Sequence, residues 1–227
     1  MRLDEEYCLS EYVDLGRLGD NEKVHIVRNQ VNGVIGVRKY VALDLEEIYL
    51  FLKENPNAYI PKIYECIQTD TNLIVIEEYL SGKNLEEMLK EKYFSEKDAA
   101  DIIICLCNAL YPLHHAKMPV ICRDLKAENV ILTNEGEVKL VDFDIARIYQ
   151  PGKSKDTVMM GTQGYAAPEQ FGFGQTDART DIYAMGVLLN YMLVREFPME
   201  KLTEGKFRTI VLKCIKINPE DRYQNVD

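Results

Sequence analysis

The chain has 227 residues, 47% of them hydrophobic, which is enough to bury a substantial core in one domain of two lobes or in two small domains. Its formal net charge of −10 would on average repel phosphate-rich partners, which argues against non-specific binding to nucleic acid or to an anionic membrane. The six cysteines show no C-x-x-C spacing and the first residues are unlike a signal peptide, so we expect reduced thiols and a cytoplasmic protein.

The first patterned stretch predicts a small antiparallel sheet. Three short runs of alternating apolar residues, separated by glycine or asparagine, lie at 12–18, 24–29 and 35–39. Residues 44–52 have the spacing of a short helix with Asp44 as its N-cap, which ends before Asn55-Pro56. The run 73–80 predicts a buried strand that leads into a hinge, and a helix is expected after Asn84.

A longer helix capped by Ser95 is predicted next. Its apolar positions recur at helical spacing and are Ala99, Ile102, Ile103, Leu106, Leu110 and Leu113. Pro112 should bend the last turn, and structural or surface roles suit His114 and His115 better than catalysis. The longest apolar run, 102–107, is too short to cross a bilayer, so no membrane contact is expected from this segment.

The most informative stretch is Cys-Arg-Asp-Leu-Lys-Ala-Glu-Asn at 122–129, followed by Asp-Phe-Asp at 142–144. Two apolar runs with a turn at 133–136 lie between them and predict a hairpin. Such a hairpin brings Asp124, Asn129 and Asp142 to one edge of a small sheet. Carboxylates, an amide and an ammonium, with no Cys or His at ligand spacing, suit Mg²⁺ and phosphate rather than zinc.

These stretches resemble the catalytic and metal-binding loops of the protein kinases, H-R-D-L-K-x-x-N and D-F-G, with Cys122 for the histidine and Asp144 for the glycine. Residues 161–169, Gly-Thr-Gln-Gly-Tyr-Ala-Ala-Pro-Glu, resemble the end of a Ser/Thr kinase activation segment. The resemblance implies an α+β, bilobal fold that forms one protein kinase domain. Residues 1–79 would form a small β-rich lobe with one helix, and residues 80–227 a larger, mainly helical lobe.

The resemblance also implies roles for the loop residues. Asp124 would be the general base or orienter of the attacking hydroxyl, and Lys126 would neutralise the γ-phosphate. Asn129 and Asp142 would hold Mg²⁺, with Mn²⁺ as an alternative. The glycine that Asp144 replaces permits backbone states that a Cβ penalises, so we expect a stiffer metal loop.

Five further residues are expected to be structural: Arg123, Thr162, Glu169, Asp181 and Arg222. By resemblance, Asp181 braces the backbone of the catalytic loop, and Arg222 pairs with Glu169 in a buried ion pair. Arg123 would pair with a phosphate on the activation segment, for which Ser154 and Thr157 are the predicted phosphosites. An ordinary flexible loop is an equally good interpretation of that segment.

The glycine-rich loop that covers the phosphates in this family is eroded here. Gly19 and Val24 are kept, but the loop is two residues shorter and lacks the second and third glycines. Two added acids would also repel phosphate, so we expect a weakened nucleotide lid. A plain hairpin turn explains the segment equally well.

Lys39 is expected to hold the α- and β-phosphates, with Val37 above the adenine. Glu47, with Glu46 close behind, is the expected partner of Lys39, although a capping-box role suits Glu47 as well.

The hinge would read the edge of the adenine through the carbonyl of Glu78 and the carbonyl and N–H of Leu80. Glu77 would then lie at the back of the adenine pocket, an unusual place for a carboxylate. Either Glu77 finds a cation such as Lys39, or the register is off by one.

The sequence thus predicts an ATP- and Mg²⁺-dependent Ser/Thr protein kinase of bacterial style, acting on a protein substrate, with a dimer for autophosphorylation in trans. The alternative is a pseudokinase, a nucleotide-binding or scaffold module, which would explain the eroded loop and Asp144. A small-molecule kinase would be expected to lack the Ala-Ala-Pro-Glu segment, and a pure interaction module would have no nucleotide site.

Overall fold

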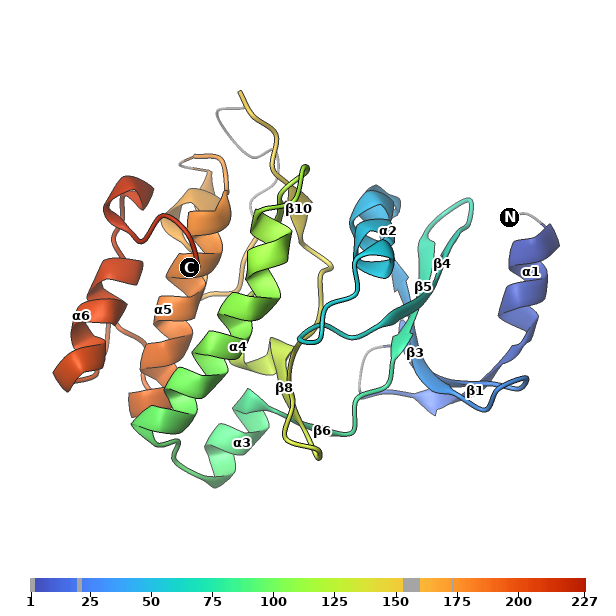
Figure 1. The fold of residues 1–227 in the computed structure, drawn as a ribbon, viewed down its shortest axis with the longest axis horizontal. Coiled ribbons are helices and arrows are strands. Elements are labelled where there is room, and N and C mark those ends of the chain that lie inside the picture. The colour runs from blue at the N-terminus through green and yellow to red at the C-terminus, as the bar shows by residue number, and fades with distance from the viewer. Residues whose placement is uncertain (1–2, 20–21, 153–159, 173) are drawn as a thin grey trace. The chain divides into compact units, whose positions relative to one another are not determined.

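The computed structural model describes residues 3–19, 22–152, 160–172 and 174–227. The chain divides into two compact units, Met1–Ser81 and Gly82–Asp227, and the predicted boundary between residues 79 and 80 lies two residues before this division. Strands dominate the first unit and helices the second, so the predicted α+β class is confirmed (Figure 1). None of the helices in the described ranges is both long and apolar enough to span a membrane.

The first unit contains a five-stranded antiparallel sheet with the order β1-β2-β3-β5-β4. Its strands are β1 (Tyr12–Arg17), β2 (Val24–Asn29), β3 (Ile35–Val41), β4 (Ile63–Gln68) and β5 (Leu73–Glu78). β5 is buried from Leu73 to Glu77, which explains its unbroken apolar run. The sequence analysis did not predict β4, in which only Ile63 and Ile67 are buried and the three residues between them are half-buried.

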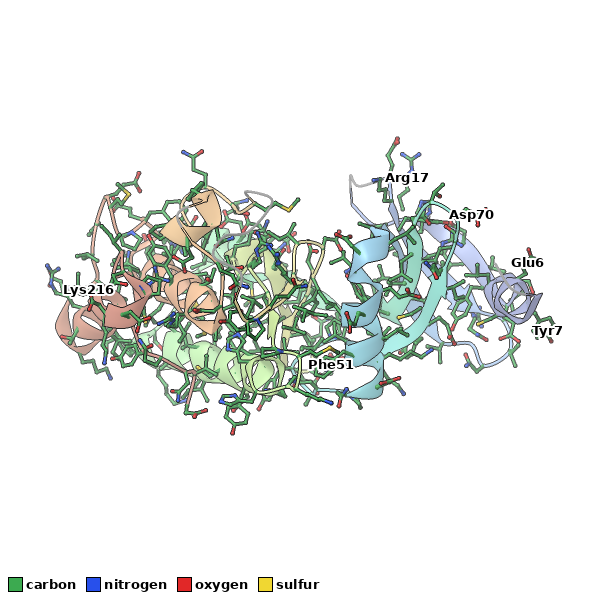
Figure 2. The ribbon with its side chains drawn as sticks, turned by 90° about the horizontal axis from the view of Figure 1, so that it is seen from above. Glu6, Tyr7, Arg17, Phe51, Asp70 and Lys216 are labelled. Carbon is green, nitrogen blue, oxygen red and sulfur yellow. The ribbon has the colours of Figure 1, made fainter. Side chains whose placement is uncertain are left out.

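The helix that covers this sheet begins later than predicted. Residues Leu43–Leu45 form a 3₁₀ turn, η1, and α2 (Glu46–Glu54) starts with Leu45 as its N-cap and no side-chain cap. The predicted cap at Asp44 is therefore wrong, because Asp44 lies inside the 3₁₀ turn. α2 packs against β4, and its Phe51 is half-buried (Figure 2). A short additional helix, α1 (Leu3–Ser10), precedes β1.

The second unit is built around helices that bury a common core. They are α3 (Leu85–Glu91), α4 (Glu96–His114), α5 (Ala178–Val194) and α6 (Gly205–Cys214). Asn84 and Ser95 each form a capping box at the start of α3 and α4, as the residue types favour. α5 is buried on nearly all sides and lies beside α4 and α6 (Figure 1).

Two small sheets carry the loops of the second unit. The predicted hairpin is present as β8 (Val130–Thr133) and β9 (Val138–Leu140), and β6 (Gly82–Asn84) pairs with β8. β7 (Val120–Ile121) pairs with β10 (Arg147–Ile148). Gly82 is required in β6, because a Cβ there would collide with the carbonyl oxygen of Leu132.

A buried ion pair joins the 3₁₀ turn Pro168–Phe171 to the C-terminal residues of this unit. Both guanidinium NH groups of Arg222 contact the carboxylate of Glu169, at 2.7 and 2.9 Å. The remaining Arg222 donors bind carbonyl oxygens of Arg179, Lys216 and Ile217. Glu169 also accepts a hydrogen bond from the Thr180 hydroxyl at 2.8 Å. Every donor of Arg222 is used, which offsets the cost of burying its charge.

Arg222→Met should leave the Glu169 carboxylate buried without its cation. We expect the free energy of unfolding to fall by about 3–5 kcal/mol, which urea unfolding measures. Lys83→Met is the matched control, because Lys83 and Glu91 form an exposed pair, and it should cost less than about 1 kcal/mol. Equal losses in the two variants would contradict the role given to the buried pair.

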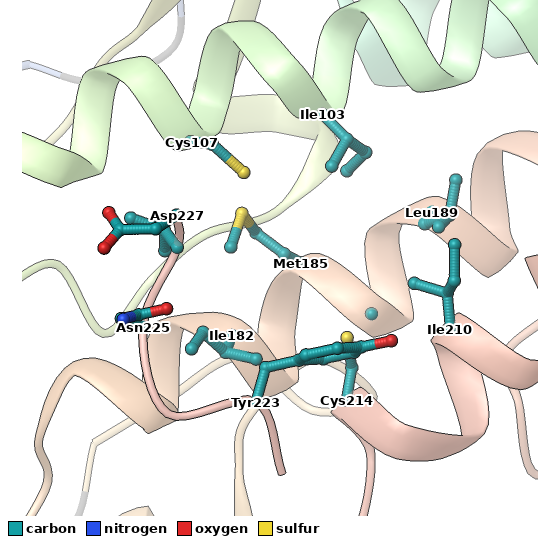
Figure 3. A pocket seen from close by; sticks show the side chains of 12 residues that line it. Ile103, Cys107, Ile182, Met185, Leu189, Ile210, Cys214, Tyr223, Asn225 and Asp227 are labelled. Atoms are coloured by element: carbon teal, nitrogen blue, oxygen red, sulfur yellow. The ribbon is translucent and has the colours of Figure 1, made fainter.

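An apolar cavity of about 240 Å³ lies between α4, α5 and α6 (Figure 3). Its lining includes Cys107 from α4, Met185 from α5 and Cys214 from α6. A Cβ on Gly186 would collide with the Cβ of Cys214, so this glycine permits close packing of α5 and α6. Burial raises the pKa of the Cys214 thiol to about 12, and the charge of Cys107 adds to the shift.

Because the thiol of Cys214 ionises near pH 9 when unfolded and near 12 when folded, its stabilising effect is complete below pH 9 and is lost as the pH rises toward 12. In this window the unfolding free energy of the wild type should fall more steeply than that of Cys214→Ala, by about 1.4 kcal/mol per pH unit. Urea unfolding of both proteins across the window measures the difference. Parallel pH profiles would show that the thiol stays accessible to solvent.

Candidate active site

The backbone of the loop 122–129 is held by one buried carboxylate, Asp181 on α5. Asp181 accepts hydrogen bonds from the amides of Cys122 and Arg123, at 3.0 and 2.8 Å, and lies 2.8 Å from Nε2 of His114. Its residue exposure is 0%, and His114 is buried at the end of α4. Arg123 adopts a left-handed backbone conformation with φ 68°, which these bonds help to hold.

Three side chains meet at the carboxylate of Asp124. Oδ1 accepts the hydroxyl of Thr162 at 2.6 Å, and Oδ2 lies 2.7 Å from Nζ of Lys126 and 3.0 Å from Nδ2 of Asn129. Lys126 also donates to the Thr162 hydroxyl at 3.1 Å. The structure therefore brings together Asp124, Lys126, Asn129 and Thr162, the last from a segment far along the chain.

Asp142 lies beside this cluster because β8 and β9 pair. The backbone amide of Val141 donates to the carbonyl of Asn129 at 2.9 Å. Asp142 directly follows Val141, so this bond holds it near Asn129. The side-chain nitrogen Nδ2 of Asn129 also donates to the Asp124 carbonyl at 2.9 Å. The side-chain amide is therefore held through its nitrogen, and its oxygen Oδ1 is left to bind a cation. An amide oxygen and a carboxylate fit Mg²⁺, which takes few protein ligands besides phosphate and water.

The described residues contain no cluster of three His, Cys, Asp or Glu side chains suited to a metal ion. The predicted metal ligands, Asn129 and Asp142, are an amide and a carboxylate, which by themselves would fill only part of a coordination sphere. That arrangement suits a metal that shares its ligands with a bound phosphate.

The substitution of Asp144 for the family glycine causes less strain than expected. The left-handed residue of this loop is Asp142, with φ 68°, whereas φ of Asp144 is not positive. Asp144 is exposed, and its amide donates to Oδ1 of Asp142 at 3.1 Å. The expected Cβ penalty at Asp144 is therefore wrong, and aspartate tolerates the left-handed state at Asp142 better than most residues.

In the first unit, Lys39 on β3 pairs with Glu77 on β5, with Nζ and Oε1 2.5 Å apart. Val37 lies opposite Glu77 in the strand register, so Lys39 and Glu77 are diagonal neighbours. The two side chains are 14% and 8% exposed, so this is a largely buried ion pair. Of the two alternatives for Glu77, the structure shows the one in which it finds Lys39.

The two carboxylates at the start of α2 differ in their surroundings. Glu47 is exposed, whereas Glu46 is half-buried. Burial raises the pKa of the Cys66 thiol on β4 to about 11, and the charges of Glu46 and Glu77 contribute to this rise. Of the two, Glu46 is the carboxylate whose charge acts on Cys66. The pairing of Glu47 with Lys39 stays a prediction.

The other predicted nucleotide residues lie in the first unit. Val37 is buried, Val24, Glu78 and Leu80 are half-buried, and Gly19 has φ 69°. The Leu18 amide donates to the Val24 carbonyl at 2.9 Å, which closes the β1–β2 connection as a hairpin. The predicted phosphosites Ser154 and Thr157 lie outside the described residues, and their proposed partner Arg123 is buried.

His114 has the structural role that was one of the two expected for it, because it bonds the carboxylate that braces the loop. The sequence analysis missed one other side chain that holds this site. Gln170 was not singled out, although it is 1% exposed and donates to the carbonyls of Arg123 and Met160. Its only signal was an amide directly after the Ala-Ala-Pro-Glu segment.

Comparison with known proteins gives a consistent result. The profile of the protein kinase domain matches residues 27–226. A probable serine/threonine-protein kinase, PknB, of Corynebacterium glutamicum is 38% identical over 56% of this chain and 20% of its own length. Protein kinase C zeta type of Oryctolagus cuniculus is 29% identical over 89% of this chain and 37% of its own. Serine/threonine-protein kinase D of Synechocystis is 27% identical over 75% and 37%.

The matches thus cover well under half the length of each of these three relatives. The family profile runs from β2 to the penultimate residue, so it covers most of the first unit and nearly all of the second, and it leaves out β1 and the β1–β2 connection. The chain belongs to the protein kinase domain family.

Proposed function

We propose that the chain is the catalytic domain of a Ser/Thr protein kinase, which transfers the γ-phosphate of ATP to protein hydroxyls with Mg²⁺ or Mn²⁺. The observation that carries this proposal is the set of contacts around Asp124, in which a carboxylate, a lysine and an amide meet within hydrogen-bonding distance. The names of the relatives, which are Ser/Thr protein kinases, support the same activity.

The contacts of Asp124 suit an acceptor for a substrate hydroxyl. A carboxylate offers about four acceptor positions, and Thr162, Lys126 and Asn129 use three of them. The remaining position, on Oδ1, is on the oxygen that carries only the Thr162 bond. A Ser or Thr hydroxyl bound there would be oriented for attack and could pass its proton to Asp124.

The other groups supply charge. Lys126 lies beside Asp124, where its ammonium can neutralise charge that develops on the transferred phosphoryl group. Asn129 and Asp142 would hold the metal, whose charge would offset the negative charge of the phosphate oxygens. In the first unit, Lys39 would bind phosphate, and the adenine would lie against Val37 and the hinge residues Glu78 and Leu80, covered by the Gly19–Val24 turn.

Two further expectations belong to this proposal. A dimer would autophosphorylate in trans at Ser154 or Thr157. The guanidinium of Arg123 would then form an ion pair with that phosphate. The cytoplasmic location stays a prediction from the thiols and the N-terminal residues.

A pseudokinase is the second candidate, and the Lys39–Glu77 pair is the observation that favours it. A carboxylate 2.5 Å from Nζ competes with phosphate for the same ammonium. In that case the chain would bind nucleotide poorly or serve as a scaffold. The two candidates predict different effects on phosphate transfer and ATP binding when the carboxylate of Asp124 or of Glu77 is replaced by an amide.

Asp124→Asn keeps the shape of the side chain but cannot accept the substrate proton. We expect phosphate transfer to fall about 10²- to 10⁴-fold, with nucleotide binding retained. Radiolabelled ATP with Mg²⁺ or Mn²⁺, beside a nucleotide-induced thermal shift, measures both quantities. Asp70→Asn is the matched control, because Asp70 lies exposed in the β4–β5 turn (Figure 2). If the wild type binds nucleotide but transfers no phosphate, the result supports the pseudokinase. If it shows neither binding nor transfer, only an interaction module remains.

Glu77→Gln removes the charge that holds Lys39. If Glu77 orients Lys39 for phosphate, the KM for ATP should rise about tenfold, a loss of about 1.4 kcal/mol. If Glu77 blocks Lys39, the variant should bind ATP more tightly than the wild type. Glu65→Gln is the control, since Glu65, on β4 of the same sheet, forms a more exposed pair with Lys53 of α2. Unchanged ATP binding in Glu77→Gln would contradict both roles.

A further inference from the structure

The buried amide of Gln170 uses all of its donors on the main chain. Gln170 lies in the 3₁₀ turn Pro168–Phe171 and is 1% exposed. Its Nε2 donates to the carbonyls of Arg123 and Met160, both at 2.8 Å, and its Oε1 accepts the amide of Ala167 at 3.0 Å. One side chain thus ties together three stretches of backbone in the second unit.

These stretches flank the contact between Asp124 and Thr162. Arg123 directly precedes Asp124, and Met160 lies two residues before Thr162, whose hydroxyl donates to Asp124 at 2.6 Å. Gln170 therefore holds the main chain on both sides of that hydrogen bond. A shift of the backbone at Arg123 or at Met160 would change the position of the Asp124 carboxylate relative to Thr162.

The local backbone is shaped to fit this amide. A Cβ on Gly161, where φ is 158°, would lie 2.8 Å from Nε2 of Gln170 and 2.5 Å from the Cβ of Ala166. Only glycine lets this segment lie so close to Gln170. On the other side, the Arg123 amide binds Asp181 and its carbonyl binds Gln170, so both polar groups of this left-handed residue are held by buried side chains.

We propose that Gln170 is a positioning residue for phosphoryl transfer, which sets the Asp124–Thr162 contact by fixing the carbonyls of Arg123 and Met160. The inference rests on the proposed kinase function. Gln170 acts through the backbone and does not touch the reacting groups. A simple packing role would need only the volume of the side chain, whereas positioning needs its two N–H donors.

Gln170→Met keeps the volume and removes the donors, so it separates these roles. We expect kcat to fall about 10- to 100-fold, with the KM for ATP changed less than about twofold. Gln175→Met is the matched control, because Gln175 donates a single, exposed hydrogen bond to the Gln150 carbonyl. A kcat equal to that of the control would overturn the proposal.

A double-mutant cycle with Thr162→Val tests the route of the effect. If Gln170 acts through the Asp124–Thr162 contact, the double variant should lose no more kcat than the worse single variant, within about twofold. Losses that multiply would show that Gln170 acts elsewhere.

Hydrogen exchange tests the clamp without any assay of activity. In Gln170→Met, amides in 122–126 and 160–167 should exchange at least about tenfold faster, with α6 unchanged. Faster exchange throughout the second unit would indicate general destabilisation and overturn the proposal. If the wild type transfers no phosphate, the proposed function fails, while the exchange still decides whether Gln170 fixes these two segments.

Discussion

The carboxylate of Asp181 is the contact on which the active-site loop depends. A buried, unpaired carboxylate would cost several kcal/mol, about the whole stability margin of a small domain, yet Asp181 has the His114 ring and two backbone amides as partners. Those amides belong to Cys122 and Arg123, the residues that enter the loop. Because Asp181 lies on α5, which is buried on nearly all sides, the loop is fixed to the helical core.

Asp124 is consequently positioned by two residues that are distant in sequence and one that is near. Asp181 accepts from the amide of Arg123, Gln170 donates to the carbonyl of Arg123, and the nearby Asn129 donates to the carbonyl of Asp124. Each of these bonds costs little entropy to form, because its side chain is already packed in the core. The left-handed backbone at Arg123, unfavourable by about 1–2 kcal/mol for a non-glycine residue, persists because several bonds hold it at once.

The sequence predicted those features whose signal is local or belongs to a long motif. The cap at Ser95, the β8–β9 hairpin and the grouping of Asp124 with Asn129 follow from residue type and spacing. The start of α2 was wrong, since a 3₁₀ turn took the place of the Asp44 cap, and the burial of Gln170 depends on contacts with residues 47 and 10 positions away. The partner of Lys39 was left between alternatives, because Glu46, Glu47 and Glu77 differ only in burial, which tertiary packing decides.

The departures from the kinase motifs do not fall equally on the two units. Cys122 is 3% exposed, and burial, with the charge of Asp181, raises the pKa of its thiol well above the usual value, so it is a neutral apolar filler. His114 supplies a ring nitrogen to Asp181, and Asp144 adopts no left-handed strain. The geometry around Asp124 therefore survives both substitutions. The features that still favour a pseudokinase are the shortened turn after Gly19 and the carboxylate on Lys39. Both lie in the first unit, which carries most of the predicted nucleotide residues, and not around Asp124.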